Sequence, residues 1–179
     1  MREIGAFDPE PALTGPTIHV RPIRSGEFEA LYAVASDPLL WAQHPARNRS
    51  QRGVFEVWFK SALEQHALVV EERSTRRVIG SSRYYHWDAV PREVAIGYTF
   101  IARGHWGGST NAELKRLMLD HAFRWADTVW FHVDAANTRS RKAMDKIGAT
   151  ASHTAPIVIN GEPAKEYVFY RIDAPRISA

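Results

Sequence analysis

The chain has 179 residues, of which 45% are hydrophobic and 24% are charged, as is typical of one globular domain with a full core. It has no cysteine, which excludes a disulfide framework, a thiolate metal site and a cysteine nucleophile. The formal net charge of +3 comes without a block of basic residues, so we expect no nucleic-acid partner. No apolar run approaches the ~18 residues of a membrane span, and acidic residues near the N-terminus argue against a secretory signal. We therefore expect a cytoplasmic protein that does not enter membranes.

The first half of the chain predicts an N-terminal arm followed by alternating helices and strands. Residues 1–16 contain three prolines and predict an extended arm, ahead of a domain at residues 17–173 and a C-terminal tail at 174–179. Apolar spacing then predicts a strand at 17–23, a helix over 28–35, irregular chain at 37–52 and a helix over 55–62. Strands are expected at 67–72, 77–87 and 93–101.

The second half predicts one crossover and a final hairpin. The clearest helix starts at Thr110, which has capping-box spacing to Glu113. Its apolar stripe includes His121, which we expect to be a hydrogen-bonded core histidine. A strand at 128–134 follows, then a helix starting near Asn137, and Asn160-Gly161 predicts a hairpin between 157–159 and 165–172. The predicted fold class is α/β (α+β), with a mostly antiparallel sheet and one strand–helix–strand crossover.

The loop at 104–110 joins the strand at 93–101 to that helix and contains glycine and hydroxyl residues. A strand that feeds a glycine-rich turn into a helix start presents unpaired backbone N–H groups to a phosphate, and the helix dipole adds positive charge there. No lysine precedes the Ser/Thr pair, which argues against a Walker A loop, and the spacing is not that of a dinucleotide fingerprint. An ordinary tight connection is the alternative interpretation.

Two segments together resemble the GCN5-related N-acetyltransferase (GNAT) superfamily, and most closely its ribosomal-protein N-terminal acetyltransferase-like branch. They are Trp106-Gly107-Gly108-Ser109 ahead of a helix, and Asn137-x-x-Ser140 followed by Lys146-Ile147-Gly148. Val20-Arg21-Pro22 with Asp37-Pro38 is also similar to that branch. The resemblance covers most of residues 17–172 and implies a single-domain GNAT-like fold, in which helices flank a twisted sheet around an acetyl-coenzyme A site.

The resemblance implies an enzyme, an acetyl-coenzyme A-dependent N-acetyltransferase. The acetyl group would pass directly to a primary amine, either a protein N-terminus or a small-molecule amine, and the enzyme would be a monomer or a homodimer. The alternative is a catalytically weak acyl-coenzyme A-binding or sensing module, because Met144 and Ala95 replace a tyrosine and a glutamate that many members use. A nucleotide site is a third interpretation. Acetyl-coenzyme A would be held by Phe100, Ile101, His105, Trp106, Gly107, Gly108, Ser109, Thr110, Asn111, Asn137 and Arg141.

Ser109 departs from the glycine that family members carry at this loop position, and it would be costly only if the backbone there needs positive φ. The resemblance implies that Ser140 is the proton donor to the departing thiolate, as in members of this branch, since the tyrosine that many other members use is replaced by Met144. Asn137 is also a good helix N-cap. The candidate general base is Glu93, with His86 and Tyr98 as further options, and the amine can alternatively arrive neutral.

The acceptor is expected across the sheet from the cofactor. Its lining is predicted to include Trp41, His44, Tyr84 and Tyr167, with Trp58 and Tyr85 as further aromatic candidates. An aromatic wall suits a cationic amine through cation–π contact, although each of these residues can equally pack in the core. The eight histidines show no metal-binding spacing, and no GxSxG elbow accompanies them, so we expect neither a metal site nor a serine hydrolase.

Overall fold

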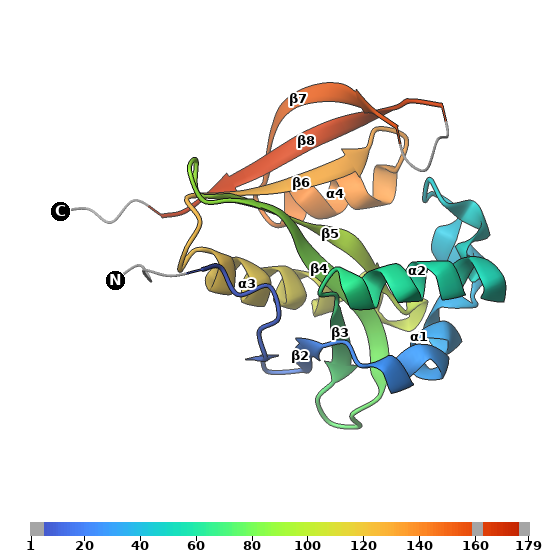
Figure 1. Ribbon diagram of the computed structural model, residues 1–179. Helices are drawn as coiled ribbons and strands as arrows, with labels where there is room; N and C mark the ends of the chain where they lie inside the picture. The colour runs from blue at the N-terminus through green and yellow to red at the C-terminus, as the bar shows by residue number, and fades with distance from the viewer. Residues whose placement is uncertain (1–5, 159–162, 176–179) are drawn as a thin grey trace.

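The computed structural model describes residues 6–158 and 163–175. Its helices and strands follow one another in the order that Figure 1 shows. They are β1 (Leu13–Thr14), β2 (Ile18–Pro22), α1 (Phe28–Ala35), α2 (Arg52–Glu64), β3 (Leu68–Glu72), β4 (Val78–Asp88), β5 (Glu93–Ile101), α3 (Thr110–Ala122), β6 (Thr128–Asp134), α4 (Thr138–Lys146), β7 (Thr150–Ile157) and β8 (Lys165–Asp173). Short 3₁₀ turns lie at η1 (Ser25–Glu27), η2 (Pro38–Trp41), η3 (Arg47–Ser50) and η4 (Arg103–His105).

The strands form one eight-stranded sheet in the order β1-β2-β3-β4-β5-β6-β8-β7. Neighbouring strands are antiparallel except β5 and β6, which are parallel because α3 carries the chain between them. This mixed sheet with a single crossover confirms the fold class that the sequence predicts.

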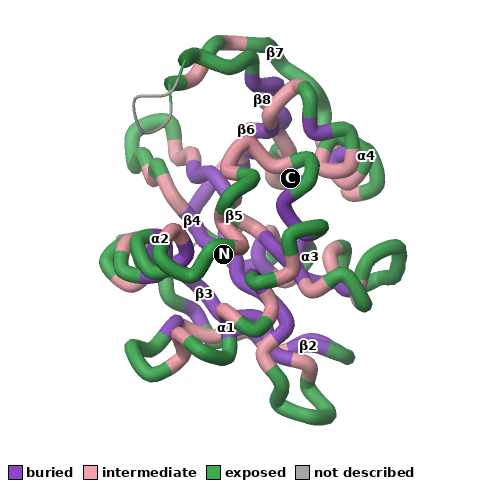
Figure 2. Tube along the Cα trace, turned by 90° about the vertical axis from the view of Figure 1, so that its right-hand side faces the viewer, coloured by how far each residue is buried: buried purple, intermediate pink, exposed green. Residues whose placement is uncertain are grey.

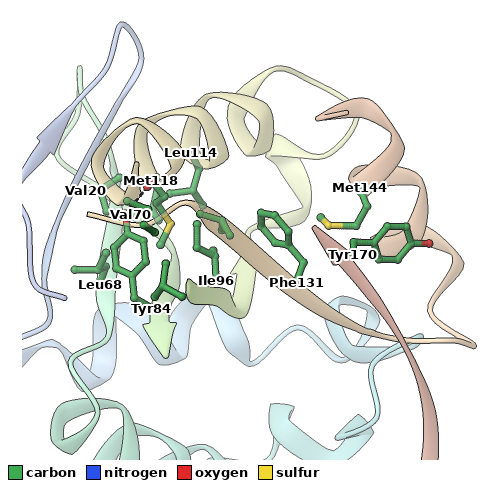
Figure 3. Packing of buried hydrophobic residues seen from close by; sticks show 14 of the residues in the cluster. Val20, Leu68, Val70, Tyr84, Ile96, Leu114, Met118, Phe131, Met144 and Tyr170 are labelled. Carbon is green, nitrogen blue, oxygen red and sulfur yellow. Dashed lines mark hydrogen bonds between the residues drawn. The ribbon is translucent and has the colours of Figure 1, made fainter. Parts of the chain in front are cut away.

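Two apolar clusters pack on opposite faces of the sheet. One lies under α3 and α4 and includes Tyr84, Leu114, Met118, Phe131 and Met144 (Figure 3). The other lies under α1 and α2 and includes Leu31, Trp41, Phe55 and Phe100. The alternation of strand side chains supplies both clusters, because successive residues point to opposite faces. Figure 2 shows the central strands buried and the outer sides of α2 and α4 exposed.

Part of the predicted N-terminal arm belongs to the folded domain. Phe7 is buried and stacks on Trp87 at 5.1 Å, and β1 pairs with β2 through Leu13 and Val20. His121 on α3 bonds the carbonyl oxygen of Asp8 at 2.8 Å, which confirms it as a hydrogen-bonded core histidine. The sequence pattern missed these contacts because the arm has no apolar periodicity.

Glu113 does not form the predicted capping box. Helix α3 does start at Thr110, but its N-cap is Ser109 and no side chain caps it. The buried Glu113 carboxylate instead accepts hydrogen bonds from the backbone N–H groups of Thr17 and Ile18, at 2.9 and 3.2 Å. The distant strand β2 therefore outcompetes the local cap for this side chain.

The last hairpin agrees with the prediction in part. Strand β8 matches its predicted range, whereas β7 starts at Thr150, earlier than the predicted residues 157–159, because its side chains are mostly exposed and carry little apolar signal. The predicted Asn160-Gly161 turn lies outside the described residues.

Candidate active site

Strands β5 and β6 separate partway along their length. They pair at only three positions, and the last pair joins Ala95 to Trp130. Beyond Ala95, the edge of β5 that faces β6 has no strand partner among the described pairings, and the strands diverge in Figure 1. Alternate residues of a strand direct their N–H and C=O groups to that edge. The gap can therefore receive an extended ligand that carries amide groups.

The loop after β5 ends at the first turn of α3, close to the open end of the gap. Gly107 has φ +76°, a left-handed conformation that favours glycine, whereas Ser109 has φ −83°. The serine at this position is therefore unstrained. No partner within residues 6–158 and 163–175 accepts a hydrogen bond from the backbone N–H groups of residues 107–112. These donors and the helix dipole fit a phosphate group.

His105 and Thr110 lie beside these donors, with Nδ1 and Oγ1 3.5 Å apart. Trp106 turns back toward β5, and its indole N–H donates to the carbonyl oxygen of Ile101 at 2.9 Å. Arg139, from the start of α4, stacks over the Trp106 ring at 4.0 Å and donates to the carbonyl of Leu40 at 3.2 Å. The predicted loop residues thus gather at one end of the gap, and Arg139 connects that end to η2.

Helix α4 starts where Asn137 accepts a hydrogen bond from the backbone N–H of Ser140, at 3.1 Å. Asn137 therefore caps the helix, as its residue type predicts. Ser140 is half-buried in the first turn. Arg141 is exposed and donates to the hydroxyl of Tyr170, at 3.2 Å. Met144 is buried against the α3 cluster, so no side chain at that position can donate a proton into the gap.

A hydrogen bond crosses β5 on the side of the sheet that α1 and α2 cover. The Tyr85 hydroxyl lies 3.1 Å from Nδ1 of His132, which connects β4 to β6. The Tyr85 ring passes over Gly97, where a Cβ atom would come within 2.9 Å of it. Burial, together with the nearby His86 and His153, lowers the pKa of His132 to about 4, and burial raises the pKa of Tyr85. The pair is therefore a neutral imidazole and a protonated phenol at neutral pH.

Glu93, the predicted base, lies where β5 and β6 are still paired. Its register partner on β6 is Thr128, and its carboxylate accepts a hydrogen bond from the Trp130 indole at 2.9 Å. The pair formed by Tyr85 and His132 lies nearer the open part of the gap. Sequence reasoning did not assign this pair, because its members are 47 residues apart and only the sheet brings them together.

Lys115 is a buried lysine on the α3 side of the gap, with 3% of its surface exposed. Its ammonium donates to Thr99 Oγ1 at 2.7 Å and lies 5.7 Å from the centre of the Phe131 ring. Burial lowers the pKa of Lys115 to about 7. The sequence does hold a signal for it, because Lys115 lies three residues before Met118 on the apolar face of α3.

The predicted acceptor residues separate into two groups. Trp41 and His44 lie on the α1–α2 side, where their rings pack at 5.2 Å. Tyr167 on β8 points to the same face, because the next residue, Val168, packs in the cluster under α3 and α4. Desolvation, together with Arg49 and Arg139, lowers the pKa of His44 to about 3. Tyr84 points to the opposite face and donates its hydroxyl proton to the carbonyl of Met118 at 2.7 Å. That contact places the Tyr84 side chain in the core and argues against its predicted role in the acceptor lining.

Within the described ranges, no group of His, Asp and Glu side chains is arranged to hold a metal ion. None of the helices described there is long and apolar enough to cross a bilayer.

Comparison with known proteins identifies the family of the chain and supports its fold. Residues 17–150 match the family model described as the acetyltransferase (GNAT) domain. No curated protein matches the chain. Among solved structures, a GCN5-related N-acetyltransferase from Brucella melitensis superposes with a TM-score of 0.80 at 16% identity, covering 92% of this chain and 81% of that one.

Two further similar structures were solved with coenzyme A or a derivative of it. Spermidine N-acetyltransferase from Vibrio cholerae, in complex with CoA and spermine, has a TM-score of 0.67 at 16% identity and covers 89% of this chain and 96% of that one. Mycobacterium smegmatis RimJ, in complex with CoA-disulfide, has a TM-score of 0.70 at 16% identity and covers 94% of this chain and 88% of that one. At these identities the superpositions describe the fold alone.

Proposed function

The chain belongs to the acetyltransferase (GNAT) family, whose enzymes move an acetyl group from acetyl-coenzyme A to an amine, and from this premise we propose how its own residues do so. The observation that carries the proposal is the gap between β5 and β6, which begins after Ala95 and ends at the unpaired N–H groups of residues 107–112. The gap fits an amide-bearing arm, and the N–H groups fit a pyrophosphate.

We assign the holding of acetyl-coenzyme A to the loop and the free edge of β5. Backbone donors from His105 to Asn111 bind the pyrophosphate, and the backbone near Phe100 and Ile101 bonds the pantetheine arm. Asn137 and Arg141 contribute from α4. Gly107 fixes the loop, because its positive φ turns successive N–H groups toward one side.

The acceptor amine approaches from the α1–α2 side, where Tyr85 and His132 lie over β5. The neutral form of the amine attacks the thioester carbon, and its nitrogen loses one proton as the amide forms. We propose that the Tyr85 oxygen accepts this proton while its own passes to Nδ1 of His132, which is neutral near pH 7. Glu93 is the alternative base, and its bond to Trp130 orients it.

The thiolate of coenzyme A leaves and takes one proton from the Ser140 hydroxyl. Ser140 regains a proton from water, and His132 releases to water the proton that it accepted, so both groups return to their starting forms. Ser140 lies in the first turn of α4, at the end of the gap, and its backbone is fixed by the Asn137 cap. Positioning supplies much of the remaining rate enhancement, because direct transfer needs few chemical groups.

The test is acetyl transfer to a panel of primary amines, measured as release of free coenzyme A and as acetylated product by mass spectrometry. We expect turnover with at least one amine, and Ser140→Ala should lower kcat with little change in the Kd of acetyl-coenzyme A. Thr138→Ala, an exposed hydroxyl in the same turn, is the matched control. Tight binding of acetyl-coenzyme A without transfer to any amine would instead favour an acyl-coenzyme A-binding module.

A further inference from the structure

Arg83 is a buried cation without a hydrogen-bonding or carboxylate partner in the described chain. It lies on β4 opposite Gly97, and only 5% of its surface is exposed. Its Nε atom is buried without an acceptor. The guanidinium carbon lies 3.4 Å from the centre of the Tyr98 ring, in contact with the ring face. Stacking of this kind leaves the N–H groups at the guanidinium edge free to bind a planar anion.

Arg49 adds a second positive charge to the same region. It is half-buried on η3, its Nε atom also lacks a partner, and it lies over the Trp41 ring at 5.2 Å. Desolvation and the charge of Arg83 lower the pKa of Arg49 to about 10, although Tyr98 and Tyr167 oppose the shift. The two guanidinium groups are therefore close enough to repel each other.

The carboxylates near these arginines do not neutralise them. Asp134, beside Tyr167, accepts a hydrogen bond from the backbone N–H of Ala136 at 2.8 Å. Glu64 lines the rim of the adjoining cavity and is exposed. Burial of unpaired cations is costly, so a ligand that supplies the missing negative charge is bound favourably.

A cavity of about 440 Å³ adjoins Arg83. Its polar lining includes Arg83, Tyr85, His86 and Tyr98. Arg83 lies one strand away from the gap, and Tyr85 in the same lining reaches over β5 to His132. An anion bound at Arg83 would thus hold the rest of the same molecule beside the proposed proton acceptor.

We infer that the acceptor is a small amine that also carries a carboxylate, which Arg83 binds through its guanidinium edge with Arg49 adding attraction. This inference rests on the proposed acetyl transfer and names the class of acceptor. A free amino acid supplies both groups in one small molecule, and a peptide whose first side chain is acidic supplies the same chemistry. A polyamine is disfavoured, because its positive charges would meet two arginines.

The experiment compares acceptors that differ only in the carboxylate. Each free amino acid is assayed beside its carboxamide, and each peptide beginning with Asp beside the same peptide beginning with Asn, with spermidine as a polycation. We expect kcat/KM to favour the carboxylate member of a pair at least ten-fold, mainly through KM. Arg83→Gln should abolish the preference and Arg49→Gln should reduce it. Arg47→Gln, an exposed arginine on the same 3₁₀ turn, should leave it unchanged.

The inference and the proposed function fail in different ways. Transfer to carboxamides or spermidine as efficient as transfer to the free acids would overturn the inference and leave the acetyltransferase function intact. Equal preference in the wild type and in Arg83→Gln would also overturn it. If no amine is acetylated, the anion site can still be tested by calorimetry. The protein is saturated with coenzyme A and titrated with N-acetyl amino acids and with their amides. Binding of the acid alone, lost in Arg83→Gln, supports the anion site, and equal or absent binding refutes it.

Discussion

Lys115 donates a hydrogen bond to Thr99 from inside the protein, so α3 places an ammonium group directly under the strand that borders the gap. Thr99 in turn bonds Ser82 on β4, at 2.8 Å between the hydroxyl oxygens. No carboxylate within residues 6–158 and 163–175 pairs with Lys115, so its ammonium group is costly to bury, and this cost leads to the first prediction.

Lys115→Met should stabilise the protein near neutral pH. The pKa of Lys115 is about 7 in the folded state and near the ordinary lysine value of 10.5 when unfolded. The unfolded chain therefore binds more protons between these values, and the wild type loses stability as pH falls from about 10.5 to 7. Thermal unfolding measured from pH 7 to 10.5 should show a Tm that is several degrees higher for the variant at pH 7, and this difference in Tm should shrink toward pH 10.5.

The control is Lys142→Met, which replaces an exposed lysine and should show no such trend. A difference in Tm between the wild type and Lys115→Met that stays the same at every pH would contradict the lowered pKa of Lys115.

Gly107→Ala should weaken acetyl-coenzyme A binding. The φ of +76° costs a residue with a Cβ atom roughly 1–2 kcal/mol, and relief of that strain would turn the N–H groups of the loop away from the pyrophosphate. Calorimetry should show a Kd raised about ten-fold. Gly104→Ala, where a Cβ atom meets nothing within 4 Å, serves as the control. Equal affinity in both variants would mean that this loop does not bind the cofactor.

Glu113→Ala should destabilise the whole domain. Burial alone would raise the pKa of Glu113, but hydrogen bonds from Thr17 and Ile18 outweigh it and lower the pKa. Removing a carboxylate that accepts these bonds leaves the N–H group of the buried Ile18 unpaired and frees that of the exposed Thr17, at a cost of about 2 kcal/mol. Urea unfolding at pH 7 measures this loss, and Asp120→Ala, exposed on the same helix, should change little. Because the pKa of Glu113 is lower in the folded state than in the unfolded state, the stability that its carboxylate contributes should be lost at acidic pH. The loss should begin near the ordinary pKa of glutamate and be complete below the folded-state pKa.

Tyr85→Phe and His132→Gln should each lower kcat on the order of 100-fold, while Glu93→Gln should leave it within a few-fold. The reason is position, because Tyr85 and His132 lie over the divergent part of β5 and β6, and Glu93 lies where the strands pair. Single-turnover acetylation with saturating acetyl-coenzyme A isolates the chemical step. A large loss in Glu93→Gln, with the other two variants near wild type, would reassign the base to Glu93.

The fold could be predicted from the sequence, and so could the positions of the loop and the helix cap that we propose hold the cofactor, because their signals are local. A strand, a glycine turn and a helix start are adjacent in the chain, and the Asn137 cap needs only its own helix. Local pattern also predicts each of the central strands within one or two residues.

The acceptor side could not be predicted in the same way. Arg49 and Arg83 are 34 residues apart in the sequence and interact only in the folded chain, and Tyr85 reaches His132 only because Gly97 lacks a side chain between them. An arginine in a strand usually faces solvent, so the residue type of Arg83 predicts an exposed side chain and does not indicate that it is buried. Glu113 shows the same limit, because its spacing to Thr110 indicates a cap while a distant strand binds it.

The most direct test of the account is calorimetric titration of the purified protein with acetyl-coenzyme A, with ATP as the control ligand. We expect saturable one-to-one binding of acetyl-coenzyme A and no comparable binding of ATP, since ATP lacks the pantetheine arm that the edge of β5 would bond. Absence of acetyl-coenzyme A binding, or tighter binding of ATP, would contradict the assignment of the gap and of residues 105–111 as the cofactor site.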